Sequence, residues 1–279
     1  MKTALFGLFL IISLNSISIA GELDILGSAE TELNLPGALL RSPSVDVLYI
    51  SSEKDNKEYM AYNFGVKIPC ISFNDNRGRR YVFGGYGGIF TRYQLHTESF
   101  NFVHADFLGA LFFDIFYKNL MFETSIYHIS SHLGDDYINN NSIEVVDTGF
   151  ESLKQDILYR LTPVIKFHIG AEYKLGRRPP QTIFYNKSLF IGVMLDGLPK
   201  KTPVFFESEL EIIGDYSPNL GIKAGVYLNY LINNFLLNKP PPAKEHHEFS
   251  LYYYNGYSKM GYFYNQREQL FMAGFTFRY

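Results

Sequence analysis

The residues best suited to chemistry gather in one short stretch, residues 127–137. It reads Tyr-His-Ile-Ser-Ser-His-Leu-Gly-Asp-Asp-Tyr. On an extended strand, residues two apart share a face about 7 Å apart along the backbone, so His128 and Ser130 project on the same side. A histidine beside a serine is the pairing in which an imidazole acts as general base to a hydroxyl nucleophile. The histidines, serines and aspartates of this stretch therefore make an acyl hydrolase one interpretation of it.

Two other interpretations of this stretch remain open. Serine, glycine and aspartate commonly form hydrogen bonds in turns, so the cluster could anchor a loop at the end of a strand. Alternatively, His132 together with His128 and a carboxylate could bind a metal ion. Imidazoles and carboxylates ligate Zn²⁺, and carboxylates ligate Ca²⁺. None of these residues requires a cofactor, and Ca²⁺ remains a possible ligand of the cluster.

The first residues predict export. Lys2 provides a positive charge, residues 4–14 are mostly apolar, and residues 18–20 present the small side chains that a signal peptidase reads. We therefore predict a signal peptide over residues 1–20, cleaved before Gly21. Its apolar run is shorter than the roughly 20 residues that a membrane-spanning helix needs.

The composition favours a membrane β-barrel over a soluble domain. The chain holds 25 Phe and 22 Tyr but no Trp, and barrels place such aromatic side chains in girdles at both membrane interfaces. The net charge of −3, with both signs mixed, excludes an electrostatic nucleic-acid partner. The single cysteine, Cys70, rules out an intrachain disulfide.

The segments that would position the cluster show a period of two. In residues 60–68, Tyr62, Phe64, Val66 and Ile68 alternate with small or polar residues, and residues 165–175 and 220–230 alternate in the same way. Such alternation separates the two faces of a strand, whereas a helix would mix them. At roughly 9–13 residues, these strands are long enough to cross a bilayer at a tilt.

The strand count predicts the architecture. We count about 12 strands, at residues 45–52, 58–69, 80–92, 100–117, 120–131, 154–162, 163–175, 187–196, 203–213, 219–233, 247–255 and 268–279. An even number suits an antiparallel transmembrane β-barrel that closes, leaving no edge unpaired in hydrocarbon. We therefore predict an all-β outer-membrane barrel over residues 44–279 in a Gram-negative-type bacterium, after a periplasmic arm over residues 21–43. Loops after odd-numbered strands, residues 131–153 among them, would face outward.

The last predicted strand, residues 268–279, carries a further signal. Phe271, Ala273, Phe275, Phe277 and Tyr279 alternate with more polar or small residues. An apolar-alternating strand that ends in an aromatic residue resembles the assembly signal of bacterial outer-membrane proteins. The resemblance implies the barrel assembly machinery as a partner.

The His-x-Ser pair resembles the outer-membrane phospholipase A and lipid A deacylase families, whose His-x-Ser pairs face outward on a barrel. The resemblance implies an acyl ester hydrolase acting on an outer-membrane lipid or lipopolysaccharide, with Ser130 as nucleophile, His128 as general base, and Asp135 or Asp136 orienting the imidazole. The Asn-Gly that follows the serine in phospholipase A is replaced here by Ser131-His132.

A second resemblance covers more of the chain. Residues 128–137, 170–173 and 254–268 are similar to the bacterial envelope family called domain of unknown function 1207. That family more often has Glu where this chain has Asp136. The resemblance implies an outer-membrane-type protein and supplies no activity.

Three functions therefore stay open. The first is a barrel of unassigned role in which the His/Ser/Asp cluster anchors an outer loop. The second is a lipid-directed acyl ester hydrolase. The third is a small channel, in which a polar lumen would be lined by Lys166, His168, Glu172, Glu207, Glu209 and Glu211.

Overall fold

The computed structural model describes residues 23–25, 43–97, 100–143, 148–178, 186–196, 203–214, 217–233 and 246–278. The predicted signal peptide and most of the predicted arm lie outside these ranges. Within the arm, Leu23–Ile25 form a short strand, β1, that pairs antiparallel with residues 71–73.

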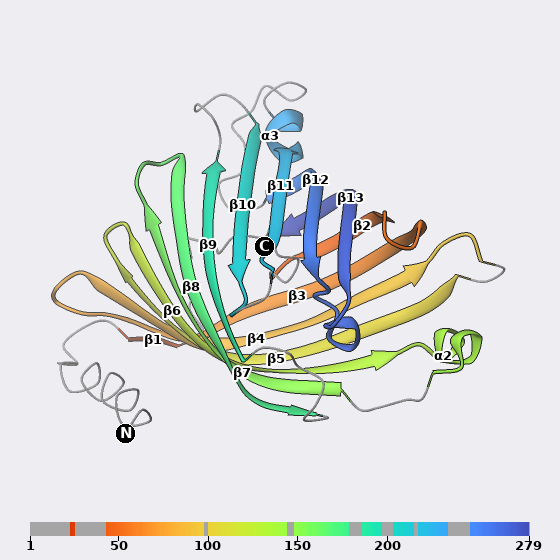
Figure 1. The fold of residues 1–279 in the computed structure, drawn as a ribbon. Helices are drawn as coiled ribbons and strands as arrows, with labels where there is room; N and C mark the ends of the chain where they lie inside the picture. Colours follow the sequence, from red (N-terminus) through yellow and green to blue (C-terminus); the bar gives the residue numbers. More distant parts are fainter. Residues whose placement is uncertain are drawn as a thin grey trace.

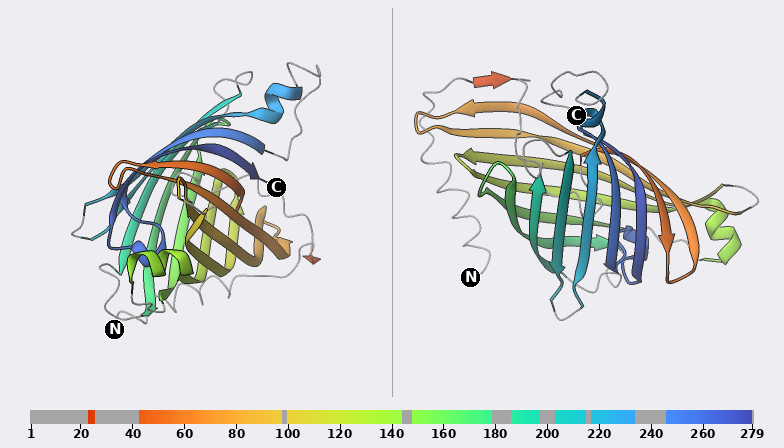
Figure 2. Two further views of the ribbon diagram at one scale, coloured as in Figure 1. Left: turned by 90° about the vertical axis from the view of Figure 1, so that its right-hand side faces the viewer. Right: turned by 90° about the horizontal axis from the view of Figure 1, so that it is seen from above.

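Twelve long antiparallel strands follow and close into a barrel (Figure 1). Each strand pairs with its neighbours in the chain, and the last pairs with the first of the twelve, as Figure 2 shows from two further sides. The predicted transmembrane barrel of about 12 strands is therefore confirmed. The strands are β2 (Val45–Ser52), β3 (Lys57–Asn74), β4 (Arg79–Gln94), β5 (Asn101–Tyr117), β6 (Leu120–Leu133), β7 (Thr148–Arg160), β8 (Ile165–Arg178), β9 (Lys187–Asp196), β10 (Val204–Ile212), β11 (Asn219–Tyr227), β12 (His246–Tyr257) and β13 (Arg267–Arg278).

The two faces of the sheet have opposite polarity. The outer face exposes large apolar side chains, such as Phe64 (53% exposed), Leu111 (54%) and Leu251 (58%). The interior instead buries charged side chains, namely Asp46, Arg92, Asp106, Asp114, Asp156, Lys166, Glu172, Glu207, Glu209, Glu211, Lys223 and Glu248. An apolar band around a closed sheet with a polar interior is what a bilayer requires. The chain is an outer-membrane β-barrel protein. No helix among the described residues is long and apolar enough to cross a membrane.

The buried charges pair with one another inside the barrel. The Lys223 ammonium lies 2.6 Å from the Glu248 carboxylate, and His168 lies between Asp156 (2.8 Å) and Glu209 (3.3 Å). The side chains that the sequence assigned to a polar lumen do face inward, and each is at most 9% exposed. Side chains therefore fill the interior around them.

Several strand boundaries differ from the sequence prediction. The sixth barrel strand, predicted at 154–162, is β7 and begins at Thr148, so part of the predicted outer loop is strand. The second, predicted to end at residue 69, is β3 and continues to Asn74 through a register shift at Pro69. The tenth, predicted to reach residue 233, ends at Tyr227 and is followed by the short helix α3 (Leu228–Leu231).

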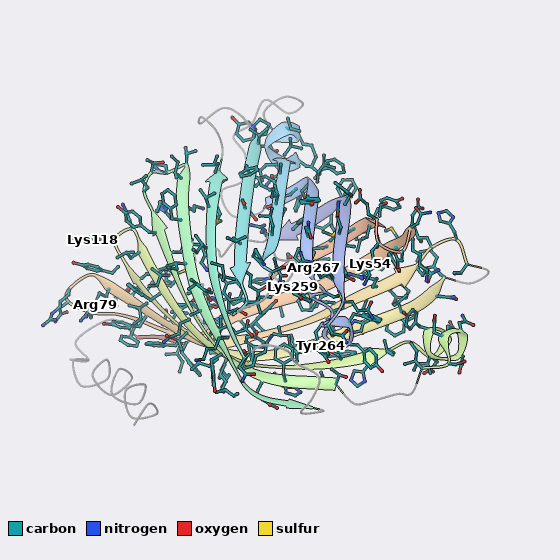
Figure 3. All side chains as sticks on the ribbon, viewed as in Figure 1. Lys54, Arg79, Lys118, Lys259, Tyr264 and Arg267 are labelled. Carbon is teal, nitrogen blue, oxygen red and sulfur yellow. The ribbon has the colours of Figure 1, made fainter. Side chains whose placement is uncertain are left out.

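Apolar side chains fill one end of the barrel, which we call the α2 end after the helix α2 (Asp135–Asn141) found there. The connection from β12 to β13 turns inward as the 3₁₀ helix η2 (Gly261–Phe263), and buries Met260 and Phe263. Figure 3 labels Lys54 and Tyr264 at this end, with Arg79 and Lys118 at the opposite end. The buried cluster comprises Leu48, Ile50, Tyr59, Ala61, Phe90, Val103, Leu133, Phe190, Tyr252, Tyr254, Met260, Phe263, Leu270 and Met272.

Candidate active site on the membrane-facing surface

Strand β6 carries the predicted site residues on its outer face. Side chains alternate between the faces of a strand, and Phe122 (39% exposed) and Ile126 (48%) mark the face that meets lipid. His128, Ser130 and His132 continue this parity toward the α2 end. His128 and Ser130 therefore share one face, as predicted, and that face points outward.

Two hydrogen bonds organise the outward-facing polar side chains. The Ser130 hydroxyl lies 2.9 Å from Nε2 of His132. Nδ1 of His128 lies 3.1 Å from the Glu151 carboxylate, which projects from the register position opposite His128 on β7. Because an ionised carboxylate only accepts hydrogen bonds, this contact assigns the proton of a neutral His128 to Nδ1. The lone pair is then on Nε2, the form in which an imidazole acts as a base.

The carboxylates predicted to orient the imidazole lie elsewhere. Asp135 and Asp136 are exposed in the first turn of α2, and no contact with His128, Ser130 or His132 is recorded within the described chain. The acceptor bonded to His128 is Glu151, which the sequence analysis missed. Its position in the predicted loop 131–153 hid the strand pairing that brings it to His128.

His132, the predicted metal ligand, contacts an aromatic ring and a hydroxyl. Its imidazole packs edge-on against the Phe107 ring, with centroids 5.6 Å apart, and bonds to Ser130. Among the residues that the structure describes, no group of three or more histidine, cysteine or acidic side chains could hold a metal ion.

Glycines flank the pair on both neighbouring strands. Gly149 lies opposite Ser130 on β7, and Gly109 lies opposite His128 on β5. A Cβ at Gly149 would come within 2.8 Å of the Ile129 carbonyl oxygen, whereas one at Gly109 would meet nothing within 4 Å. The space beside His128 is therefore open on the β5 side, whereas Gly149 is closely approached by the backbone of β6.

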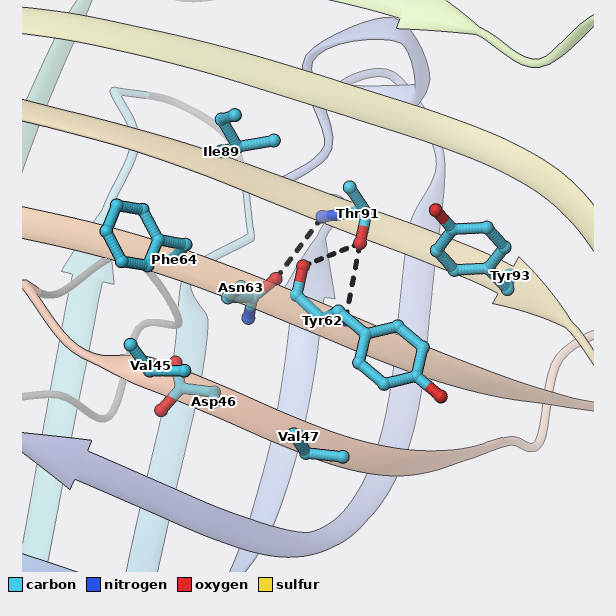
Figure 4. Close-up of a pocket in the computed structure, with 9 residues that line it drawn as sticks. All are labelled: Val45, Asp46, Val47, Tyr62, Asn63, Phe64, Ile89, Thr91 and Tyr93. Carbon is cyan, nitrogen blue, oxygen red and sulfur yellow. Dashed lines mark hydrogen bonds between the residues drawn. The ribbon is translucent and has the colours of Figure 1, made fainter.

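A separate groove lies on the outer face across β2, β3 and β4 (Figure 4). It contains none of the site residues above. Its lining is formed by Val45, Asp46, Val47, Tyr62, Asn63, Phe64, Ile89, Thr91 and Tyr93.

Comparison with solved structures finds outer-membrane phospholipases of the same fold. The Salmonella typhi outer membrane phospholipase dimer with bound calcium matches with a TM-score of 0.61 and 12% identity, over 91% of this chain and 95% of that one. Outer membrane phospholipase A from Escherichia coli matches with a TM-score of 0.59 and 13% identity, over 89% and 95%. At these identities the likeness establishes the fold alone. No functionally curated protein matches the sequence.

A family match covers more than half of the chain. The family described as "Protein of unknown function (DUF1207)" matches residues 42–204. This range spans β2 to β9 and includes His128, Ser130, His132 and Glu151. The earlier resemblance to domain of unknown function 1207 is confirmed, and the chain belongs to the DUF1207 family.

Proposed function

We propose that this protein hydrolyses an acyl ester of an outer-membrane lipid, with Ser130 as nucleophile, His128 as general base and Glu151 as the orienting carboxylate. One observation carries the proposal. His128, bonded through Nδ1 to Glu151, stands two residues from Ser130 on the face of β6 that meets lipid. Nucleophile, imidazole and carboxylate are the three parts of a serine hydrolase site.

The reaction follows from these roles. Nε2 of His128 takes the proton of the Ser130 hydroxyl as the oxygen attacks the ester carbonyl, forming an acyl-enzyme. The protonated imidazole returns that proton to the leaving alcohol. Water then attacks the acyl-enzyme with the same base and releases the fatty acid.

Before it reacts, the Ser130 hydroxyl must leave its hydrogen bond to His132 and form one to His128. In the described conformation its hydroxyl bonds His132. Both imidazoles lie two residues from Ser130 on the same face, so rotation about the Cα–Cβ bond to another staggered position redirects the hydroxyl. We assign the base to His128 because only its second nitrogen has a recorded acceptor, Glu151.

The location of the cluster supports a lipid as substrate. His128 and Glu151 have side chains that are 55% and 51% exposed on a surface otherwise formed by exposed apolar groups such as Phe107 and Ile126. Such a surface is in contact with lipid, and the open space at Gly109 leaves room for an ester group beside His128. Phospholipid and lipopolysaccharide both carry acyl esters, so both belong in the test.

Strand β13 remains our candidate for recognition by the barrel assembly machinery.

Calcium has no assigned step in this mechanism. The Salmonella phospholipase carries bound calcium, and calcium prefers six to eight oxygen ligands. Near the site, the described residues offer one carboxylate, Glu151, and it is bonded to His128. These residues do not fit a calcium site, so we derive no step through the ion.

The test is fatty-acid release from vesicles that contain phosphatidylethanolamine, with or without lipopolysaccharide, by the refolded barrel. Ser130→Ala should abolish release, and His128→Ala should reduce it by about 10²-fold or more. Glu151→Gln should cause a smaller loss, because an amide oxygen still accepts a hydrogen bond. Thr124→Ala, on the same outward face of β6, is the matched control and should change nothing.

His132→Ala separates the two possible bases. Release should remain at the wild-type order of magnitude, because the variant removes only the competing partner of Ser130. If His132→Ala is inactive and His128→Ala is active, His132 is the base and our assignment is wrong. Release that survives Ser130→Ala would refute the hydrolase altogether.

A further inference from the structure

We propose that Ser131, held inside the barrel by Asp106 and the β12–β13 loop, is a positioning residue for the outward-facing Ser130 and its two histidines. This inference rests on the proposed hydrolysis. It assigns a role to Ser131, which belongs to the polar stretch of β6 but points away from lipid.

Ser131 is clamped on the inner face of β6. Its side chain is 3% exposed, and its hydroxyl donates to the Asp106 carboxylate at 2.5 Å. Asp106 is fully buried and lies directly opposite Ser131 on β5. His104, two residues along the same strand, places Nε2 3.1 Å from the same carboxylate. A buried carboxylate needs such partners, because removing it from water is costly.

The β12–β13 loop docks on this clamp. The backbone N–H of Gly261 donates to Asp106 at 3.0 Å. A Cβ at position 261 would lie 2.0 Å from the Ser131 hydroxyl oxygen, so only glycine allows this approach. The β12–β13 loop, through Gly261, therefore contacts both Asp106 and Ser131 inside the α2 end.

A second contact ties the loop to the end of β6. The Phe263 ring of η2 lies 5.6 Å from His104 and 5.7 Å, edge-on, from Tyr137 of α2. The helix α2 begins two residues after Leu133, where β6 ends. The loop thus contacts β6 at Ser131 and also the helix that continues the chain beyond His132.

This clamp sets the direction of the outer site because neighbouring side chains on a strand point to opposite faces. The Ser131 contact adds to the ladders that pair β6 with β5 and β7, and it restrains this end of β6 with Ser130 and His132 facing outward on either side. Ser125 shows the contrast. It also faces the interior of β6 and is buried, but no side-chain hydrogen bond is recorded for it within the described chain.

The first arm of the test measures catalysis. Ser131→Ala and Gly261→Ala should lower kcat by about 10- to 100-fold, since a misplacement of about 1 Å can cost that much, with KM nearly unchanged. Asp106→Asn keeps an acceptor for Ser131 and should retain more activity than Asp106→Ala. Ser125→Ala is the matched control. The difference in gel migration between unheated and heated samples checks that each variant is folded.

The second arm measures position without catalysis. A nitroxide label on Ser130→Cys, in a Cys70→Ser background, reports motion on the outer face by electron paramagnetic resonance. Ser131→Ala and Gly261→Ala should each make the label more mobile, while Ser125→Ala should not. Gly261→Ala perturbs the clamp from the loop side, so it decides the matter if Ser131→Ala fails to fold.

The two arms separate the two claims. Unchanged kcat and unchanged label mobility in folded Gly261→Ala would overturn the positioning role, as would equal losses in Ser125→Ala. A wild-type protein that releases no fatty acid would refute the proposed hydrolysis, and label mobility alone would then decide whether the clamp orients the outer face.

Discussion

Thr91 completes the hydrogen-bond ladder between β3 and β4 on the surface that meets lipid. The paired residues jump from Met60 and Tyr93 to Asn63 and Phe90. In this gap the Thr91 hydroxyl donates to the Tyr62 carbonyl oxygen at 2.6 Å and accepts from the Tyr62 N–H at 3.3 Å (Figure 4). Water is absent from the hydrocarbon region, so the Thr91 hydroxyl substitutes for the missing ladder bonds of Tyr62, while Oδ1 of Asn63 accepts from the Thr91 N–H at 3.3 Å.

Thr91→Val should destabilise the barrel by about 2–4 kcal/mol. Valine keeps the shape of threonine but removes the hydroxyl, and the N–H and C=O of Tyr62 lose this partner. Each unsatisfied buried backbone group costs about 1–3 kcal/mol. The expected destabilisation is less than the largest sum for two such groups, because β3 and β4 can move together and form some of the missing backbone hydrogen bonds directly.

The assay is urea unfolding of the barrel in lipid vesicles, followed by far-ultraviolet circular dichroism. Thr124→Val is the matched control, because Thr124 also lies on the outer face and no side-chain hydrogen bond is recorded for it in the described chain. That variant should be neutral or slightly stabilising in contact with lipid. An unfolding midpoint of Thr91→Val equal to that of wild type, or an equal loss in Thr124→Val, would show that the hydroxyl does not complete the ladder.

Three shorter predictions follow from other parts of the barrel. Lys223→Met should cost about 3 kcal/mol, because it leaves the buried Glu248 carboxylate without the ammonium at 2.6 Å, and urea unfolding should show no such loss for Lys54→Met on the surface. In the turn after β3, partial burial would raise the pKa of Asp75, but bonds from the N–H groups and guanidinium that follow it lower that pKa to about 2. A depressed pKa stabilises the fold above pH about 4, so Asp75→Asn should be less stable than wild type at pH 7, and the gap should close as the pH falls toward 2. Planar bilayers containing the protein should stay electrically silent, because apolar side chains fill the α2 end; steady single-channel currents would contradict this.

Period-two alternation predicted the barrel because most of its outer face is uniformly apolar. Tyr62, Phe64, Val66 and Ile68 were assigned to one face, and all are exposed. The number of strands and the closed architecture follow from repeating that pattern. The neighbours of a residue on adjacent strands depend on strand pairing, and a local sequence pattern does not contain that information.

The prediction failed where the outer face becomes polar. Residues 148–153 lack that pattern, because Gly149 and Glu151 stand where the apolar alternation requires lipid-facing side chains. These same residues lie opposite Ser130 and His128. Departures from local rules are expected at functional sites, and here the departure concealed the carboxylate that bonds the imidazole.

The inward turn of the β12–β13 loop was also beyond sequence reasoning. Its docking depends on Asp106 and Ser131, which are more than one hundred residues away in the chain, and on the absence of a side chain at Gly261. Nothing in the composition of a nine-residue connection distinguishes a loop that extends outward from one that folds into the barrel.

The position of Ser131 bears on which function the polar stretch serves. A loop anchor and a catalytic group must point to opposite faces of β6, because the loop docks inside the barrel and lipid lies outside. Ser131 bonds the inner Asp106 clamp, so anchoring is served by the inward residue. On the outer face, where polar groups are costly in contact with lipid, His128 is bonded to Glu151 and Ser130 to His132. Loop anchoring therefore accounts for Ser131 and leaves the outward residues unexplained, whereas the hydrolysis that we propose would account for both their chemistry and their direction.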